Sequence, residues 1–262
     1  MEAMPAASKL NLQNPPVVET ALQIQFSDLP HWSTLHHGLY FPLIRERFPK
    51  FTHIQEIPPV VETFPPHRKR IQFQLSTQQD VGCAQFENES EDRLIRVQRN
   101  RFAYHWLSKA ATRDTNGYPS YDANLSACFD ELSTFSDYCG TNALGPIQPL
   151  LCEVMYLNHV RPLEGESIEQ MVESIFQTRI GSFEMFTLNR TFALEGKGRL
   201  YAELNTSFDD GRPYVTFQLT SRINHTEGEL RSSLDLAHSW LIEAFCKLTS
   251  PIVRKERWQE ID

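Results

Sequence analysis

The sequence predicts an α+β protein built from a β-α-β(n)-α module that occurs twice, with antiparallel sheets and helices packed on one face. A strand, a helix, further strands and a closing helix run from about Val17 to Gly140, and the same order returns from about Leu150 to Thr249. Hydrophobic residues at 40% and charged residues at 22% are typical of globular chains. We therefore expect a loose arm (1–15), a first module (16–145) and a second module (146–262), the two packed as one body.

The first module opens with an alternating segment, Val17–Phe26, in which every second residue is apolar, as in a strand with one buried face. A short helix is expected over about 39–48, with Pro42 in its first turn, where a missing N–H costs little. Ile57–Pro66 contains four prolines. This density excludes a central strand or a helix and predicts an extended connector or an edge segment.

Two further strands are expected at Ile71–Leu75 and Leu94–Trp106, and the polar segment 77–92 between them is expected to be a loop or a wide hairpin end. A strong helix follows, and Gly140 is a suitable C-terminal stop. Its apolar stripe has helical spacing and comprises Leu125, Phe129, Leu132 and Phe135.

The second module begins with a strand at Leu150–Val160, which matches the first strand in length and in its place before a helix. Ser167 and Gln170 form a capping-box pattern at the start of that helix. Three strands joined by tight turns are expected at about Phe183–Leu194, Arg199–Phe208 and Tyr214–Ile223. A last helix begins near Ser232 or Ser233, and Pro251 is expected to end it.

Net charge, the length of apolar segments and the cysteine pattern exclude several classes of function. The net charge of −8 and the pI of about 5.6 argue against general nucleic-acid binding, which needs clustered positive charge. No apolar segment approaches the roughly 20 residues that span a bilayer, and no signal peptide is visible, so no membrane association is expected. The five cysteines form no C-x-x-C pair. They predict reduced thiols and a cytoplasmic location.

The densest candidate site is the segment Arg96–Trp106, in which basic and aromatic residues alternate. On one strand, Phe102, Tyr104 and Trp106 would project to one face and Arg99, Arg101 and His105 to the other. Such a surface can grip an anion or a single-stranded nucleic acid by charge and stacking. An ordinary strand, with core aromatics and arginines paired to carboxylates, explains the same pattern and is favoured.

Glu153 and His159 share a face of the strand at 150–160, and Asn158 faces the opposite way. They are six residues apart, roughly 20 Å along a strand, and therefore cannot form a catalytic pair by direct contact. Isolated, hydrogen-bonded polar groups are the better interpretation. The binding candidates, taken together, are Arg96, Arg99, Arg101, Tyr104, His105, Trp106, Glu153 and His159.

Motif searches identify no catalytic or metal site. Neighbours such as His36 and His37 point apart on a helix or strand, and no nearby residues complete a tetrahedral metal site. There is no G-x-S-x-G, H-E-x-x-H or Rossmann fingerprint. We expect no metal and no cofactor.

Several phrases spread over about 16–258 carry a resemblance: VVETALQIQF, GLYFPLIRERFP, IPPVVETFPP, LIRVQRNRFAYHW, CEVMYLNHV and LDLAHSWLIEAFCKLT. Together they resemble a sporadically distributed bacterial family that carries only a placeholder name. The resemblance implies no agreed activity, cofactor or site residue, although patchy distribution fits accessory genes such as toxin–antitoxin or phage-defence cargo. The element order is also similar to the TATA-binding-protein-like and helix-grip arrangements, a likeness of topology that does not carry function.

Three functions follow as hypotheses. The first is a non-catalytic binding protein that engages a protein partner or a small ligand on a sheet face or in the cleft between modules, with Arg99 and Arg101 as the favoured contacts. The second is an enzyme with an acid–base site in a sheet-lined cavity, using Glu153, His159 or His105. The third and weakest is nucleic-acid binding through the Arg/aromatic strand.

Overall fold

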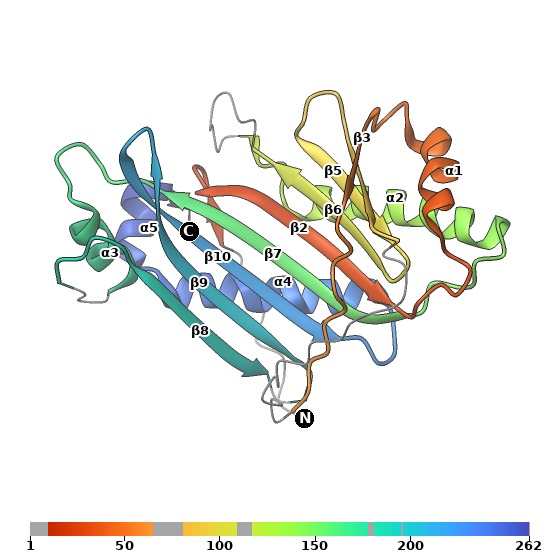
Figure 1. The fold of residues 1–262 in the computed structure, drawn as a ribbon. Helices are drawn as coiled ribbons and strands as arrows, with labels where there is room; N and C mark the ends of the chain where they lie inside the picture. The colour runs from red at the N-terminus through yellow and green to blue at the C-terminus, as the bar shows by residue number, and fades with distance from the viewer. Residues whose placement is uncertain (1–9, 65–80, 109–116, 178–180, 195, 262) are drawn as a thin grey trace.

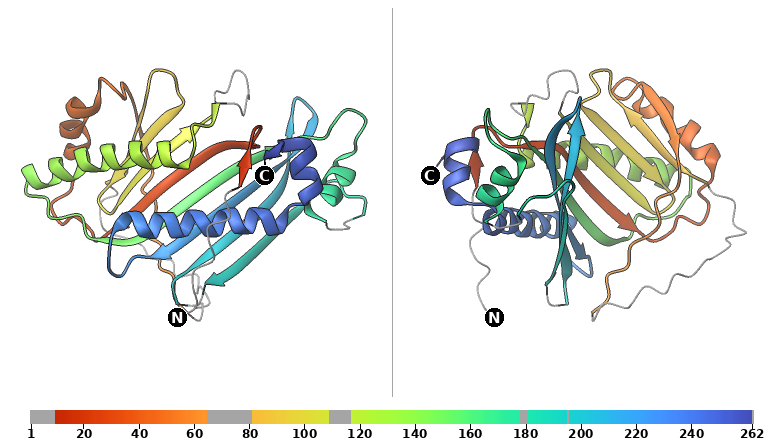
Figure 2. Two further views of the ribbon diagram at one scale, coloured as in Figure 1. Left: turned by 180° about the vertical axis from the view of Figure 1, so that it is seen from behind. Right: turned by 60° about the vertical axis from the view of Figure 1, so that its left-hand side comes forward.

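The computed structural model describes residues 10–64, 81–108, 117–177, 181–194 and 196–261. Nine strands form one antiparallel sheet in the order β3-β4-β5-β6-β2-β7-β10-β9-β8. The long helices α2 and α4 both lie on one face of this sheet, as the view from behind shows (Figure 2). The opposite face, toward the viewer in Figure 1, carries no helix among the described residues. The α+β class with helices packed on one face is therefore confirmed.

The chain order in each half follows the sequence prediction closely. The first half contains β2 (Val17–Phe26), α1 (Thr34–Ile44), β3 (Lys50–Ile54), β4 (Cys83–Glu87), β5 (Arg93–Gln98), β6 (Arg101–Leu107) and α2 (Tyr121–Thr141). The second contains β7 (Pro149–Val160), α3 (Ile168–Phe176), β8 (Thr187–Leu194), β9 (Gly198–Asp209), β10 (Arg212–Asn224), α4 (Leu230–Leu248) and α5 (Pro251–Trp258). Among the described residues, the halves match in order except that the first has one more strand and the second has an additional helix, α5. A common origin of the halves stays a prediction.

The two halves meet where β2 pairs with β7, and this pairing makes one continuous sheet instead of two. The register places Thr20 opposite Tyr156 and Leu22 opposite Val154. Alternate residues of β2 then face the helices, and the remaining ones face the open side. Leu22, Ile24 and Phe26 are accordingly buried in the core beneath the helices.

The core fills the space between the sheet and α2 and α4. On β6, Phe102 packs against Phe135 of α2, and Trp106 packs against Tyr118 just before that helix. On β10, Phe217 packs against Phe245 of α4 and Phe176 of α3. Burial of large aromatic side chains is the dominant stabilising term in a core of this kind.

One strand prediction in the first half is wrong, and the segment predicted as a loop or wide hairpin end contains a further strand. The segment 94–106 is a hairpin, β5 and β6, which turns at Arg99 and Asn100. Asn100 forms a hydrogen bond with Asp28 and so stabilises the turn, although no glycine marks it. The expected loop over 77–92 contains β4, whose buried Phe86 pairs opposite Ile95. The strand expected at 71–75 lies outside the described residues.

Two prolines occupy other positions in their helices than the sequence predicts. Helix α1 begins at Thr34, so Pro42 stands near its last turn and not in its first. Ser33 and His36 form a capping box at the start of α1, which the sequence analysis missed. Pro251 does not simply end the last helix, because it occupies the first turn of a further helix, α5.

Short strands connect the ends of the described chain. Strand β1 (Asn11–Leu12) pairs antiparallel with β11 (Glu260–Ile261). The backbone N–H groups of Gln13 and Asn14 donate to the carbonyls of Gln259 and Trp258, which extends the contact. The described end of the predicted loose arm is therefore held against the C-terminal helix.

The buried imidazole of His37 generates a stability prediction. Both ring nitrogens are buried without a hydrogen-bond partner among the described residues, and the ring lies 5.6 Å from Trp32 and 5.7 Å from His53. Burial, with the nearby His53 and His36, lowers the pKa of His37 from 6.5 to about 4. The unfolded chain therefore takes up a proton between about pH 6.5 and 4 that the folded chain does not, and stability falls as the pH drops through this window.

We expect His37→Leu to raise the free energy of unfolding by about 1 kcal/mol at neutral pH, because it removes an unpartnered buried polar group. Its stability should also fall less between pH 6.5 and 4 than that of the wild type. Urea unfolding followed by circular dichroism at several pH values measures both effects. The exposed His31 provides the matched control, His31→Leu, which should change neither quantity. A destabilised H37L variant would show that His37 makes a favourable contact.

Candidate functional site

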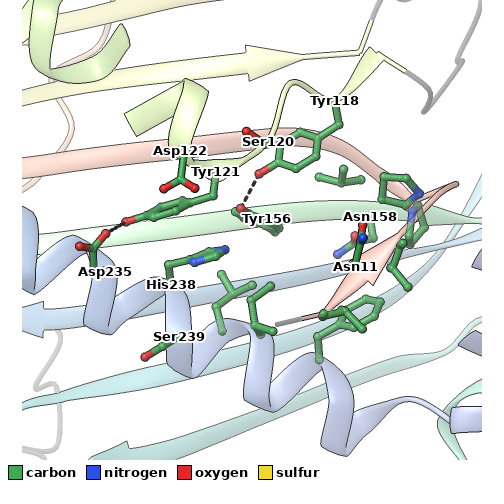
Figure 3. A pocket seen from close by; sticks show the side chains of 18 of the residues that line it. Asn11, Tyr118, Ser120, Tyr121, Asp122, Tyr156, Asn158, Asp235, His238 and Ser239 are labelled. Atoms are coloured by element: carbon green, nitrogen blue, oxygen red, sulfur yellow. Dashed lines mark hydrogen bonds between the residues drawn. The ribbon is translucent and has the colours of Figure 1, made fainter. Parts of the chain in front are cut away.

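A groove opens between the two helices that cover the sheet (Figure 3). Its volume is about 710 Å³, which is within the range of small-molecule sites. Tyr156 and Asn158 of β7 form its floor, and the start of α2 and one side of α4 form two walls. One end is closed by residues 10–13 and 15 of the N-terminal arm, together with Pro16 and Val17 at the start of β2. The groove therefore lies at the junction of the two halves.

Three tyrosines and one histidine gather in the groove (Figure 3). The hydroxyl groups of Tyr118 and Tyr156 form a hydrogen bond of 2.6 Å. The rings of Tyr121 and His238 stack in parallel at 3.7 Å, and the Tyr121 hydroxyl donates to Asp235 at 2.9 Å. These contacts connect α2 with β7 and α4, so the cluster is fixed by elements that are rigid on their own.

The chain enters this cluster through an unusual backbone conformation. Ser120, the N-cap of α2, has φ of +93°, and its hydroxyl accepts a hydrogen bond from the backbone N–H of Ala123. Such a conformation is costly for a residue with a side chain. It turns the chain between Tyr118 and Tyr121, so that both rings reach the same groove.

The cluster is uncharged at neutral pH. Burial, together with Tyr118 and other neighbours, raises the pKa of Tyr156 well above its ordinary value. Burial raises the pKa of Tyr118 to about 12 and lowers that of His238 to about 4. Charged groups, such as Asp122 and the Arg231–Asp235 pair, lie at the exposed rim. The interior therefore offers ring faces and neutral hydrogen-bonding groups.

The residues singled out from the sequence lie elsewhere, and they do not form one site. Tyr104 and Trp106 are buried in the core on the helix side of the sheet. Arg99 lies in the β5–β6 turn and pairs with Glu56 at 2.7 Å. The other predicted residues lie on the open face: Arg96, Arg101, His105, Glu153 and His159. None of the predicted residues lines the groove.

A polar network covers the centre of the open face. Arg101 donates to Gln23, Gln25 and the Pro58 carbonyl, and Glu153 accepts from Gln23 and Arg222. Arg101 and Glu153 are only 4% and 5% exposed. Glu153 is ion-paired with Arg222, as a buried charge requires. Arg101 is bound by neutral acceptors instead, and its Nε has no hydrogen-bond partner among the described residues.

The predicted acid–base residues are separated from one another on this face. His105 forms a hydrogen bond of 2.9 Å with Glu19 on β2. Burial lowers the pKa of His105, and the bond to Glu19 only partly offsets this effect. The His159 ring lies against Tyr214, 4.9 Å between centroids, at the far end of β7. Glu153 and His159 thus share a face of the sheet, as predicted, but their side chains do not converge on one position.

The groove residues could not be recognised from the sequence. Tyr118 and Tyr121 follow a polar segment, Tyr156 lies within a strand, and His238 lies on a helix more than 80 residues further on. No short motif connects these segments. The one local signal was the strand at 150–160, where alternation places Tyr156 and Asn158 on the face opposite Glu153.

Comparison with known proteins gives no assignment: no protein-family model matches the chain, and neither does any curated protein. Among the described residues, no three His, Cys, Asp or Glu side chains are grouped as a metal would require. Within the same residues, no helix has the length and apolar character needed to cross a bilayer.

Arg99 and Arg101, the two contacts that the sequence favours for binding, provide a matched pair for mutation. Arg101→Ala should lower the free energy of unfolding by about 2–4 kcal/mol, because it removes a buried side chain and takes its donors away from the Gln23 side-chain oxygen and the Pro58 carbonyl. Arg99→Ala should cost less than about 1 kcal/mol, because its ion pairs lie near the surface. Chemical denaturation of both variants measures the difference. Equal and small losses would show that Arg101 is available for a binding partner and is not structural.

Proposed function

We propose that this chain is a non-catalytic binding protein that holds a small, uncharged, largely apolar ligand in the groove between α2 and α4. The observation that carries this proposal is the groove itself, which has a volume of about 710 Å³ and lies at the junction of the two halves. Ligand sites in proteins are commonly concave, mostly apolar and located between structural units.

The lining supports this class of ligand. Leu12, Leu241, Ile242 and Phe245 supply apolar surface, and the parallel Tyr121–His238 pair supplies flat rings for stacking. The neutral imidazole of His238 offers a hydrogen bond for one polar end of a ligand, whereas the NH2 group of Asn158 already donates to the Phe217 carbonyl. A charged ligand would lose hydration without a buried counter-ion, because the charged lining residues lie at the rim.

Binding is favoured over the two rival hypotheses on geometric grounds. An acid–base enzyme needs two titratable groups that converge on a cavity, and Glu153, His105 and His159 do not line the groove. Of the titratable groups that do line it, Asp122 and Asp235 are exposed at the rim, and burial lowers the pKa of His238 to about 4. Nucleic-acid binding needs cations that are free to meet phosphate, but Arg101 and Arg222 are engaged by buried partners on the open face.

We also propose a cellular compartment and a biological role for this protein. All five cysteines are unpaired, and burial raises the pKa of the Cys83 thiol to about 11 and of the Cys152 thiol to about 12. Buried, protonated thiols of this kind favour a reducing compartment, which we propose to be the cytoplasm. A role as an antitoxin-like or phage-defence accessory protein in a bacterium is compatible with a ligand-binding module.

A bulky substitution in the groove tests the proposal. Ser239 lines the groove on α4, so Ser239→Trp should fill part of it with an indole ring. The probe is N-phenyl-1-naphthylamine, an uncharged aromatic compound whose fluorescence rises in apolar surroundings. We expect the wild type to bind it with a micromolar Kd and S239W to bind at least ten times more weakly.

The control is Ser232→Trp, which adds the same ring to an exposed position of α4 outside the groove. Its affinity for the probe should equal that of the wild type. Circular dichroism and thermal melting confirm that both variants are folded. Equal binding by S239W and S232W, or no binding by the wild type, would contradict a ligand site in this groove.

A further inference from the structure

A strap, defined as residues 57–64, crosses the open face of the sheet from β5 toward β9 (Figure 1). The prediction of an extended connector is confirmed for these residues, which form neither helix nor strand. Pro58, Pro59 and Val61 are exposed, whereas Glu62 points inward and is 7% exposed. The strap is therefore a single extended layer that is held to the sheet through specific contacts.

Two glutamines of the sheet bind the backbone of the strap in the same way. The Gln98 side chain accepts from the N–H of Ile57 at 3.0 Å and donates to its carbonyl at 2.9 Å. The Gln25 side chain accepts from the N–H of Val60 at 2.7 Å and donates to its carbonyl at 2.9 Å. Ile57 and Val60 are three residues apart, which is one turn of a polyproline II helix. Because these contacts involve only backbone groups of the strap, the two glutamines could bind any extended chain with this spacing, regardless of its side chains.

A second set of contacts is specific for a carboxylate. Glu62 accepts hydrogen bonds from Arg199 and from the Tyr201 hydroxyl, and its carboxylate lies 3.7 Å from Arg222. The Glu62 carbonyl accepts from Asn224 at 3.2 Å. Phe64 follows, with the guanidinium of Arg199 over its ring at 4.4 Å. The face thus combines a backbone-binding half with a carboxylate-binding half.

The sheet side chains in these contacts depend on an extended chain lying over them. Gln98, Gln25 and Arg199 are 0%, 6% and 6% exposed. Buried polar groups need partners, and on this face the strap supplies them. Peptide recognition by proteins uses the same elements, namely a pre-extended proline-rich segment, backbone hydrogen bonds and one charged anchor.

We propose that this face is a binding site for an extended, proline-containing peptide segment of a partner protein that carries a glutamate five residues after its first backbone anchor. The strap occupies the site in cis and acts as a built-in competitor. The charge complementarity of Arg199 and Arg222 with a carboxylate selects the partner segment. The site shares no residue with the groove between α2 and α4, and it does not depend on the function proposed for that groove.

A peptide with the sequence of residues 56–64, EIPPVVETF, is the probe, labelled with fluorescein and followed by fluorescence polarisation. Glu62→Ala in the full chain removes the carboxylate anchor of the strap and should allow the peptide to bind in trans. A tethered competitor acts at an effective concentration of about millimolar. We therefore expect E62A to bind the peptide at least tenfold more tightly than the wild type.

A second variant loosens the strap through a different contact. Val60→Pro removes the N–H that Gln25 accepts while keeping an extended backbone, so it should also bind the peptide more tightly than the wild type. Val61→Ala, at a position whose side chain is 76% exposed, is the matched control and should behave as the wild type. A peptide with Gln in place of the glutamate corresponding to Glu62 should bind E62A at least tenfold more weakly.

Folded E62A and V60P variants that bind no peptide would overturn the proposal, and so would equal binding of the Glu and Gln peptides. If neither variant folds, the wild type provides the test. At millimolar concentration, a peptide with a photo-reactive group at the position of Phe64, whose ring lies against Arg199, should form crosslinks to β9. Crosslinks distributed over other surfaces, or none, would show that the face is closed to partners.

Discussion

The antiparallel pairing of β2 with β7 is the constraint on which the rest of the structure depends. Because these strands form hydrogen bonds along most of their length, each half contributes its strands to one sheet. The two long helices, one from each half, lie on the same face of that sheet (Figure 2). Without this pairing each half would expose an unpaired strand edge, which is an aggregation hazard. The groove between α2 and α4 exists because two helices from different halves cover one surface without filling the space between them.

The same pairing brings together the polar groups of the open face. Gln23 of β2, Arg101 of β6 and Glu153 of β7 come from three neighbouring strands, and their hydrogen bonds cross the boundary between the halves. A buried network of this kind adds little net stability, but removing one member is expensive, because its partners stay buried. It therefore favours the observed register over shifted ones. A shift of β2 by one residue would turn these glutamines into the core.

Much of the fold could be predicted from the sequence, because local sequence signals determine many of its strands and helices. Period-two alternation in Val17–Phe26 and Pro149–Val160, and the capping box at Ser167, are local signals that the structure keeps. One error occurred where a tertiary contact decides: the β5–β6 turn depends on Asn100 reaching Asp28, more than 70 residues away. The start of α1 was missed for a local reason, because His36 caps Ser33 in the position where Glu or Gln is usual. The groove was not predictable, because Tyr118, Tyr156 and His238 meet only after the two halves join.

Strand β7 has side chains in the groove and side chains in the network beneath the strap. We therefore ask whether binding at one site would affect binding at the other. Tyr156 and Asn158 face the groove, whereas Glu153, five residues or fewer away, faces the network beneath the strap. A strand paired on both sides, as β7 is with β2 and β10, is stiff, and its alternating side chains meet different partners on each face. Energetic coupling between the faces would need an element with two discrete arrangements. β7 is held by continuous ladders through its centre, so the two sites should bind their partners independently.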